Sequence, residues 1–341
     1  MIGKPKQHIF ANDRLRISVT SCCNFKCIYC TNEGQAHNNN DFISVEFIKR
    51  LSDFIKTNGV YIKKINITGG EPLLHPGLIE IVTALNGCAD ALTLNTNGEL
   101  LDFQKIIALK NAGINCIKFG IDSFFKKTTK PFYKNTACNR EKVIENFFFA
   151  KSAVPRTSIN MVLTDFNCHE FEDNLNFCIS NKIDRVEFLE LITFDFRKRG
   201  ETFSYGRPFT EVFKEDKGFF KKISYNIRLG KYLCETHNGL TMQMADDFCK
   251  SRVCRNLWTR IDAKENLVSC IKTRAKIKID FSQLFDQAKM NNNLMCDAIV
   301  DKRIVRNYDG ELLPENVKGD YHPSYTEIIQ GSNIKFSELD L

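Results

Sequence analysis

The stretch LRISVTSCCNFKCIYC, residues 15–30, joins a strand-like segment to a loop that carries four cysteines. Apolar and polar residues alternate over LRISVT, which is the period of a half-buried β-strand. The thiols of Cys23, Cys27 and Cys30 therefore belong to one tight loop that directly follows a strand. Such a loop fits three kinds of chemistry: disulfides, a zinc site or an iron–sulfur site.

The same strand signal recurs along the first half of the chain, separated by segments of helical period. This alternation is typical of βα units around a parallel sheet. The predicted strands are LRISVT (15–20), KINIT (64–68), LTLNT (92–96), CIKFGI (116–121), SINMVL (158–163) and RVEFLE (185–190). Six such steps suit either a doubly wound sheet or a partial barrel, and periodicity does not choose between them.

Five helices are predicted between these strands. The first contains Phe47, Leu51 and Ile55 at helical spacing, and Asn58-Gly59 follows it where a left-handed cap is expected. The other four span residues 77–86, 102–112, 140–153 and 169–181. Gly113 follows residues 102–112 in the same capping role.

Length and composition indicate a globular protein. The 341 residues predict one large domain or two of ordinary size, and no apolar run approaches the roughly 18 residues of a membrane span. No secretory signal is visible, so we expect a cytoplasmic location, where 14 cysteines favour metal sites over disulfides. The lysines behind the net charge of +7 are scattered, which argues against a nucleic-acid partner.

Three cysteines on one loop suit a four-iron cluster. They leave one iron without a protein ligand, and that iron can bind a substrate or cofactor. A tetrahedral zinc ion needs a fourth ligand, and neighbouring residues such as Cys22 and Cys23 rarely both reach one ion. Zinc and unligated buried thiols stay open as alternatives.

The spacing Cys23-x3-Cys27-x2-Cys30, with the aromatic Tyr29 before the last cysteine, resembles the signature of the radical S-adenosylmethionine (SAM) superfamily. The resemblance implies that these cysteines hold a [4Fe-4S] cluster whose open iron chelates SAM, with Tyr29 in the cofactor-binding set. It also implies that one electron cleaves SAM to methionine and a 5′-deoxyadenosyl radical, which abstracts hydrogen from a substrate.

Two further motifs carry the resemblance. TGGEP (68–72) stands where the family places a Gly-Gly-Glu-Pro motif that receives the methionyl end of SAM. Gly69 and Gly70 let the backbone approach a ligand closely, and Glu71 can accept from an ammonium group. NTNG (95–98) resembles a SAM-contacting strand end, with Thr96 as the contact; a simple Asn-Gly turn is the alternative.

The superfamily also implies an architecture. It is a partial (β/α)6 TIM-like barrel with its chemistry at the carboxyl ends of the strands, where the cysteine loop, TGGEP and NTNG all fall. We expect this core to occupy residues 1–215.

A second cysteine group, Cys249-x4-Cys254-x15-Cys270, is expected in an auxiliary domain at residues 216–275. The last two cysteines are separated by a predicted β-hairpin, WTRID to LVSCI. Three thiolates there suit a second, auxiliary [4Fe-4S] cluster, and a structural zinc site is the alternative. Residues 276–341 are predicted to be a tail or a cover segment.

Over about four fifths of its length the chain resembles the molybdenum-cofactor GTP 3′,8-cyclase family, in segments such as KKINITGGEPLLHPGLIEIV and CRNLWTRIDAKENLVSC. That family binds guanine at an auxiliary cluster and triphosphate with a fan of cations. Cationic positions are kept at Arg16, Lys64 and Arg260, which we take as catalytic, substrate-facing residues. Cations are lost at Asn66, Ser158, Glu187 and Trp258, so a triphosphate would be held poorly.

The sequence therefore predicts a radical SAM enzyme that abstracts hydrogen from a peptide or nucleoside-type substrate in a biosynthetic pathway and drives its cyclisation, rearrangement or oxidation. The expected partners are that substrate and an electron donor such as flavodoxin or ferredoxin. Two alternatives are the GTP 3′,8-cyclase itself and a non-catalytic iron–sulfur or zinc scaffold that binds RNA.

Overall fold

The structure is a computed structural model of the 341-residue chain. It describes residues 6–35, 40–125, 138–164, 166–183, 185–190, 218, 220–226, 231–245, 258–268 and 276–293.

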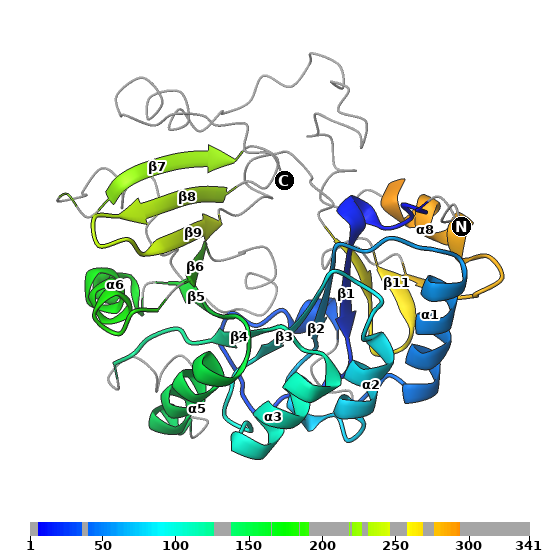
Figure 1. Ribbon diagram of the computed structural model, residues 1–341, viewed down its shortest axis with the longest axis horizontal. Coiled ribbons are helices and arrows are strands. Elements are labelled where there is room, and N and C mark those ends of the chain that lie inside the picture. The colour runs from blue at the N-terminus through cyan, green and yellow to red at the C-terminus, as the bar shows by residue number, and fades with distance from the viewer. Residues whose placement is uncertain are drawn as a thin grey trace, which may run out of the picture.

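Six parallel strands in chain order form the centre of the molecule (Figure 1). They are β1 (Arg14–Ser18), β2 (Lys64–Thr68), β3 (Ala91–Thr96), β4 (Cys116–Gly120), β5 (Thr157–Leu163) and β6 (Arg185–Glu190). Each corresponds to a predicted strand within two residues at either end. The prediction of parallel βα units is confirmed.

Helices connect these strands on the outer side of the sheet (Figure 1). They are α1 (Val45–Thr57), α2 (Leu78–Leu85), α3 (Phe103–Ala112), α5 (Arg140–Ala153) and α6 (Phe171–Ser180). Side chains cap three of them: Ser44, Asp102 and Asn139 each accept a hydrogen bond from the backbone N–H three residues on. Gly113 ends α3 at a φ of 120°, as its place in the sequence predicts.

The sheet continues beyond this centre at both ends and forms an open arc (Figure 1). The described strands make one twelve-stranded sheet in the order β12-β11-β10-β1-β2-β3-β4-β5-β6-β9-β8-β7. On one side lie β7 (Phe220–Asn226), β8 (Lys231–Thr236) and β9 (Thr241–Ala245); on the other lie β10 (Thr259–Ile261), β11 (Asn266–Val268) and β12 (Lys276–Lys278). The curved sheet, parallel from β1 to β6 and covered by outer helices, confirms the predicted partial TIM-like barrel.

Alternating side chains give the sheet an apolar outer face and a polar inner face. On β1 and β2, Leu15, Ile17, Ile65 and Ile67 are fully buried in the hydrophobic core. The residues between them, such as Arg16 and Asn66, point to the opposite face because successive strand side chains alternate. We call the space along this inner face the lumen.

The hairpin predicted from WTRID and LVSCI is present as the antiparallel pair β10 and β11. Its place in the sheet was not predicted: β10 pairs in parallel with β1, and the Thr259 hydroxyl accepts a 2.9 Å hydrogen bond from the N–H of Ala11. Residues near 260 therefore form a wall of the lumen beside the first strand.

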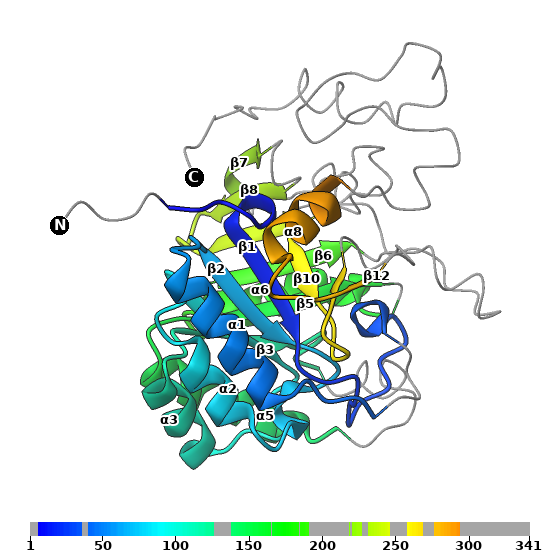
Figure 2. The same cartoon turned by 90° about the vertical axis from the view of Figure 1, so that its right-hand side faces the viewer.

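Part of the predicted tail packs onto this edge. The helix α8 (Leu284–Asn293) lies beside β10 and β11 (Figure 2). Phe281 and Phe285 contact Phe54 of α1, with ring centroids 6.1 and 5.3 Å apart. Among the helices of the described residues, none is both long and apolar enough to cross a membrane.

The substitution Gly70→Ala tests how tightly the second βα turn packs. A Cβ atom at Gly70 would lie 2.0 Å from the carbonyl oxygen of Cys22, which is backbone and cannot rotate away. We expect the free energy of unfolding to fall by about 3 kcal/mol, at the upper end of overpacking costs. Urea titration measures it.

Gly120→Ala is the matched control, because its Cβ atom would lie 3.8 Å from its nearest neighbour, the carbonyl oxygen of Thr96. We expect a change within about 1 kcal/mol there. Equal losses in the two variants would contradict the close packing at Gly70.

Candidate active site

The cysteine loop and the TGGEP turn meet backbone to backbone. The N–H of Gly70 donates to the carbonyl of Thr20 at 2.8 Å, and the N–H of Glu71 donates to the carbonyl of Cys22 at 2.7 Å. Gly69 leaves equally little room, since a Cβ atom there would lie 2.4 Å from the Thr20 oxygen. In the structure both glycines approach the backbone of the cysteine loop closely. Their predicted close approach to a ligand stays a prediction.

The three predicted cluster ligands lie on this loop with their thiols partly withdrawn from water. Burial, with smaller contributions from Glu71 and Cys30, raises the pKa of the Cys23 thiol to about 12. Burial, Asp122 and the other two thiols raise the pKa of Cys27 well above its ordinary value. Thiolates at these positions therefore need a strong positive charge beside them, such as metal ions provide.

Backbone groups prepare two of the sulfurs as acceptors. The N–H of Phe25 donates to the sulfur of Cys23 and the N–H of Asn32 donates to the sulfur of Cys30, each at 3.3 Å. Hydrogen bonds of this kind stabilise cluster-bound thiolates. Among the described residues, no three His, Cys, Asp or Glu side chains are gathered closely enough to hold a single metal ion. Three thiols on one loop, two of them with backbone N–H donors, fit an iron–sulfur cluster by their chemistry.

Tyr29 ties the cysteine loop to the strand ends opposite. Its hydroxyl donates to Oδ2 of Asp122 at 2.6 Å, and Oδ1 of Asp122 accepts from the N–H of Val162 at 3.0 Å. Asp122 is almost fully buried, so this link is shielded from water. In the structure Tyr29 positions the loop; its predicted contact with a cofactor stays a prediction.

Glu71 joins the ends of β2 and β3. Its carboxylate accepts from the Thr96 hydroxyl at 2.7 Å, from the N–H of Asn97 at 2.8 Å and from the N–H of Leu73 at 3.0 Å. Burial nevertheless raises the pKa of Glu71 to about 7. The structure brings Glu71 and Thr96 together as the sequence predicts, with the two side chains bonded to each other.

A series of side-chain hydrogen bonds, which the sequence did not predict, continues from the contact between Glu71 and Asn97. The amide of Asn97 donates to Oδ1 of Asn24 on the cysteine loop, and the amide of Asn24 donates to Glu99, both at 2.8 Å. The NTNG segment therefore holds the loop as well as the TGGEP turn. The signal available in the sequence was the run of side-chain amides, which an ordinary turn would also contain.

The predicted substrate-facing cations line the lumen. Arg16 pairs in register with Arg260 on one side and with Asn66 on the other, and Lys64 pairs with Arg14. Burial and the positive charges of Lys118, Arg185 and Arg14 lower the pKa of Lys64 to about 7. A substantial fraction of Lys64 is therefore uncharged near neutral pH.

Two carboxylates offset the charge of cations in the lumen. The sequence alone did not connect either carboxylate with its cationic partner. Glu33, on the cysteine loop, accepts hydrogen bonds from Arg16, and its other oxygen lies 4.0 Å from Nε of Arg260. Glu187 lies 2.8 Å from the ammonium of Lys118, a cation that no motif singled out. Both pairs join residues far apart in the sequence.

Buried side-chain oxygens of Asn66, Thr93 and Ser158 have no hydrogen-bond partner among the described residues. Asn66 and Thr93 are paired across β2 and β3, and Ser158 is paired with Lys118 across β5 and β4. Buried polar groups are almost always bonded. These oxygens on the inner face therefore mark places where a polar ligand or water can bind.

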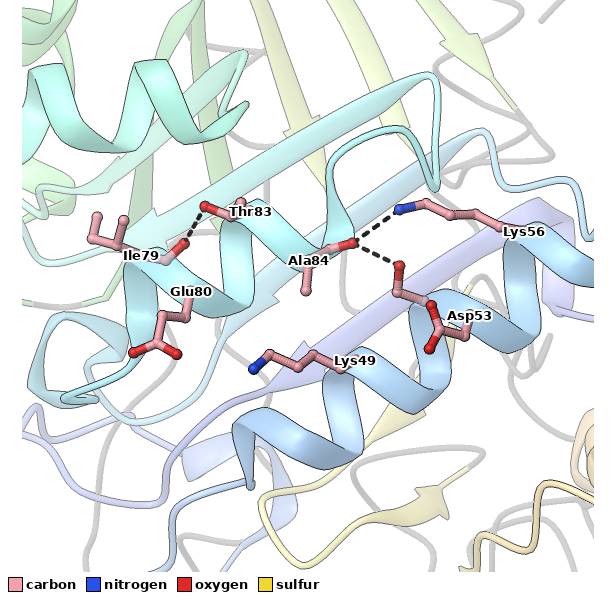
Figure 3. Close-up of a pocket in the computed structure, with 8 residues that line it drawn as sticks. Lys49, Asp53, Lys56, Ile79, Glu80, Thr83 and Ala84 are labelled. Atoms are coloured by element: carbon pink, nitrogen blue, oxygen red, sulfur yellow. Dashed lines mark hydrogen bonds between the residues drawn. The ribbon is translucent and has the colours of Figure 1, made fainter.

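A separate depression of about 370 Å³ lies between α1 and α2 on the outer side of the barrel (Figure 3). Charged side chains such as Lys49, Asp53 and Glu80 line it, and its floor is occupied by bonds from Ser52 and Lys56 to the carbonyl of Ala84. It is a groove between packed helices and is remote from the cysteine loop.

The second cysteine group, Cys249, Cys254 and Cys270, lies outside the described residues. The hairpin strand that carries Arg260 is described and stands beside β1.

Comparison with known proteins agrees with this geometry. A model of the Radical SAM superfamily matches residues 17–178, from β1 through α6. The GTP 3′,8-cyclase of Clostridium perfringens (strain SM101 / Type A) is 25% identical over 330 residues, which cover 87% of this chain and 97% of the relative. The GTP 3′,8-cyclase of Peptoclostridium acidaminophilum is 36% identical over 188 residues, which cover 53% of this chain and 55% of the relative.

Solved structures share the fold at low identity. Streptococcus suis SuiB bound to S-adenosylmethionine has a TM-score of 0.59 at 14% identity and covers 85% of this chain and 71% of its own. Native anSMEcpe with bound AdoMet and Cp18Cys peptide has a TM-score of 0.56 at 14% identity, with coverage of 84% and 82%.

The fold and the cysteine loop define an enzyme of the radical SAM class. Residues 17–178 match the Radical SAM superfamily, and the chain resembles the GTP 3′,8-cyclase family. The superfamily implies a [4Fe-4S] cluster and SAM as cofactors. These similarities to enzymes argue against the alternative of a non-catalytic scaffold.

Thr96→Val tests the bond between the two predicted SAM-contacting residues. The variant removes the hydroxyl that donates to the buried Glu71 carboxylate and accepts from the N–H of Gly98. We expect the free energy of unfolding to fall by about 2 kcal/mol, measured by urea titration. Thr83→Val, at an exposed position of α2, is the control and should change it by about 0.5 kcal/mol or less. Equal effects would show that the Glu71 bond adds nothing.

Lys64→Met tests the charge state of the lumen. The pKa of Lys64 in the folded protein, about 7, lies below the value near 10.4 of an unfolded lysine, so the folded state binds fewer protons between these values. The wild-type free energy of unfolding should contain a part that rises from pH 7 to pH 10, and the variant should lack that part. Urea midpoints across this range measure the difference, with the exposed Lys49→Met as control. Parallel curves for wild type and Lys64→Met would disprove the shift.

Proposed function

We propose that this radical SAM enzyme abstracts hydrogen from a peptide or nucleoside-type substrate bound in the lumen, and that cyclisation, rearrangement or oxidation of that substrate follows in a biosynthetic pathway. The observation that carries the proposal is the inner face of the sheet. It begins at the cysteine loop and is lined by cations that carboxylates offset. It also contains buried oxygens of Asn66, Thr93 and Ser158 that have no hydrogen-bond partner within the part of the chain that the structure describes.

Cys23, Cys27 and Cys30 would hold the [4Fe-4S] cluster, since the raised thiol pKa values of Cys23 and Cys27 and the backbone donors to Cys23 and Cys30 suit that group. When bound, the cluster supplies the electron that generates a 5′-deoxyadenosyl radical from SAM. Gly69, Gly70, Glu71 and Thr96 would form the SAM-facing edge, and Tyr29 would keep the loop in place through Asp122. The chain's own contribution is to fix the loop against two strand ends.

Arg16, Lys64 and Arg260 would contact the substrate from the walls of the lumen. Their charge is lower than three free cations would give, because Glu33 contacts both arginines and the pKa of Lys64 is about 7. A substrate with little or no phosphate fits this balance. The peptide in the anSMEcpe structure supports a peptide as one such substrate.

We further propose an auxiliary cluster held by Cys249, Cys254 and Cys270, within a segment of about residues 216–275 that follows a barrel core of residues 1–215 and precedes residues 276–341. The hairpin strand β10 supports this, because it places the sequence between Cys254 and Cys270 beside β1 and the lumen. A reduced flavodoxin or ferredoxin would supply electrons.

GTP 3′,8-cyclisation is the second candidate. It is favoured by the relatives of that name and by the register that sets Arg16 beside Arg260. It requires a triphosphate to compete with Glu33 and Glu187 for the lumen cations.

The test is anaerobic reconstitution followed by assay of iron, sulfide and 5′-deoxyadenosine with SAM and dithionite. We expect about eight irons per wild-type chain and about four in a Cys249/Cys254/Cys270 triple Ala variant, with deoxyadenosine formed by the wild type. A Cys23/Cys27/Cys30 triple Ala variant should form none. Cys22→Ala is the matched control on the same loop and should retain iron and turnover.

Zinc in place of iron, without deoxyadenosine, would contradict the proposal. Addition of GTP separates the two candidates: a cyclised purine product would establish the second, whereas unchanged GTP beside continuing deoxyadenosine formation would eliminate it.

A further inference from the structure

The carboxylate of Glu33 lies beside two arginines of the lumen, Arg16 and Arg260. Oε1 of Glu33 accepts from Nε and Nη2 of Arg16 at 3.0 and 2.5 Å, and Oε2 lies 4.0 Å from Nε of Arg260. Arg16 and Arg260 are directly paired across β1 and β10, so their guanidinium groups form a fork open toward the cysteine loop. Each guanidinium group can bind a carboxylate or phosphate group with two parallel hydrogen bonds.

Glu33 belongs to the cysteine loop, and the backbone of that loop positions its side chain beside Arg16 and Arg260. Glu33 lies in the short turn Asn32–Gly34 with a φ of 55°, a left-handed conformation that is uncommon for glutamate. Side-chain bonds hold the turn on both sides: the amide of Asn32 donates to the carbonyl of Ser21 at 3.1 Å, and Gln35 bonds to Ser18 at 2.8 Å and to the N–H of Ala263 at 3.0 Å. The turn is therefore fixed by contacts independent of the ion pair.

Glu33 also fills the space at the fork. The cavity bounded by Arg16, Glu33, Thr68 and Arg260 has a volume of about 10 Å³, which is no more than a water molecule needs. The Thr68 hydroxyl lies 3.5 Å from the same carboxylate oxygen. The Glu33 carboxylate therefore occupies the space between the two arginines that an anion contacting both would need.

We infer that Glu33 is a specificity-determining residue that occupies the Arg16–Arg260 fork as an internal anion, so that the lumen accepts an uncharged substrate group there and excludes polyphosphate. This deepens the proposed function and rests on it in one respect, that the lumen is the substrate site. The two arginines would form an anion-binding site if the Glu33 carboxylate did not occupy the space between them.

The test measures anion binding without turnover. Inorganic tripolyphosphate is titrated into the full-length, cluster-reconstituted protein without SAM at low ionic strength, and the dissociation constant is measured by calorimetry. Wild type should bind weakly, and Glu33→Gln should bind at least tenfold more tightly because the fork is released.

Two variants make the comparison specific. Glu33→Gly removes the same carboxylate and suits a φ of 55°, so it should show the same gain even if glutamine perturbs the turn. Glu265→Gln is the control of equal charge change: Glu265 contacts Lys278 and Ser44, away from the fork, and its loss should leave binding within twofold of wild type.

A double variant, Arg16→Gln with Glu33→Gln, should lose the tenfold gain. Tripolyphosphate binding by wild type as tight as by Glu33→Gln would overturn the inference, and so would an equal gain in Glu265→Gln. Failure of the proposed function has a different signature, since it would appear as absent deoxyadenosine formation by wild type, whatever the anion titrations show.

Discussion

The backbone contact between the cysteine loop and the turn after β2 is the constraint on which the rest of the site depends. The N–H groups of Gly70 and Glu71 donate to carbonyls of the loop, and the backbones lie so close that no side chain fits at Gly69 or Gly70. The contact brings the loop to the carboxyl ends of the parallel strands, where Tyr29, Asn24 and Glu71 then find their partners. Without it the cysteines would belong to an exposed loop with no fixed relation to the lumen.

The polar inner face of the sheet is the second feature that shapes the site. Strand alternation gives it polar side chains, and the parallel pairing of β10 with β1 adds a wall that comes from a distant part of the chain. Its cations are offset locally, by Glu33 at Arg16 and Arg260 and by Glu187 at Lys118. A lumen of this kind is polar without being strongly cationic, and its unpartnered oxygens favour ligands rich in hydrogen-bonding groups.

Sequence relatives and solved structures resemble this chain in different respects. The GTP 3′,8-cyclase of Clostridium perfringens (strain SM101 / Type A) aligns with 87% of this chain at 25% identity, whereas the solved structures with SAM or peptide bound share the fold at 14% identity. The solved structures share the barrel fold with this chain. The radical SAM assignment comes from the family model and the GTP 3′,8-cyclase relatives. We propose that the charged side chains of the lumen decide which substrate this chain accepts.

The sequence by itself determined the order and type of the central elements, since LRISVT, KINIT and the helical segments carry their own periods, and it identified the cysteine loop, Glu71 and Thr96 through motifs of short range. Only the tertiary structure decided that Glu33 meets Arg16 and Arg260, that Lys118 meets Glu187 and that β10 stands beside β1. Local periodicity records which face a residue takes on its own strand. It does not record which distant strand or loop will lie opposite, because that choice is made by packing of the whole sheet.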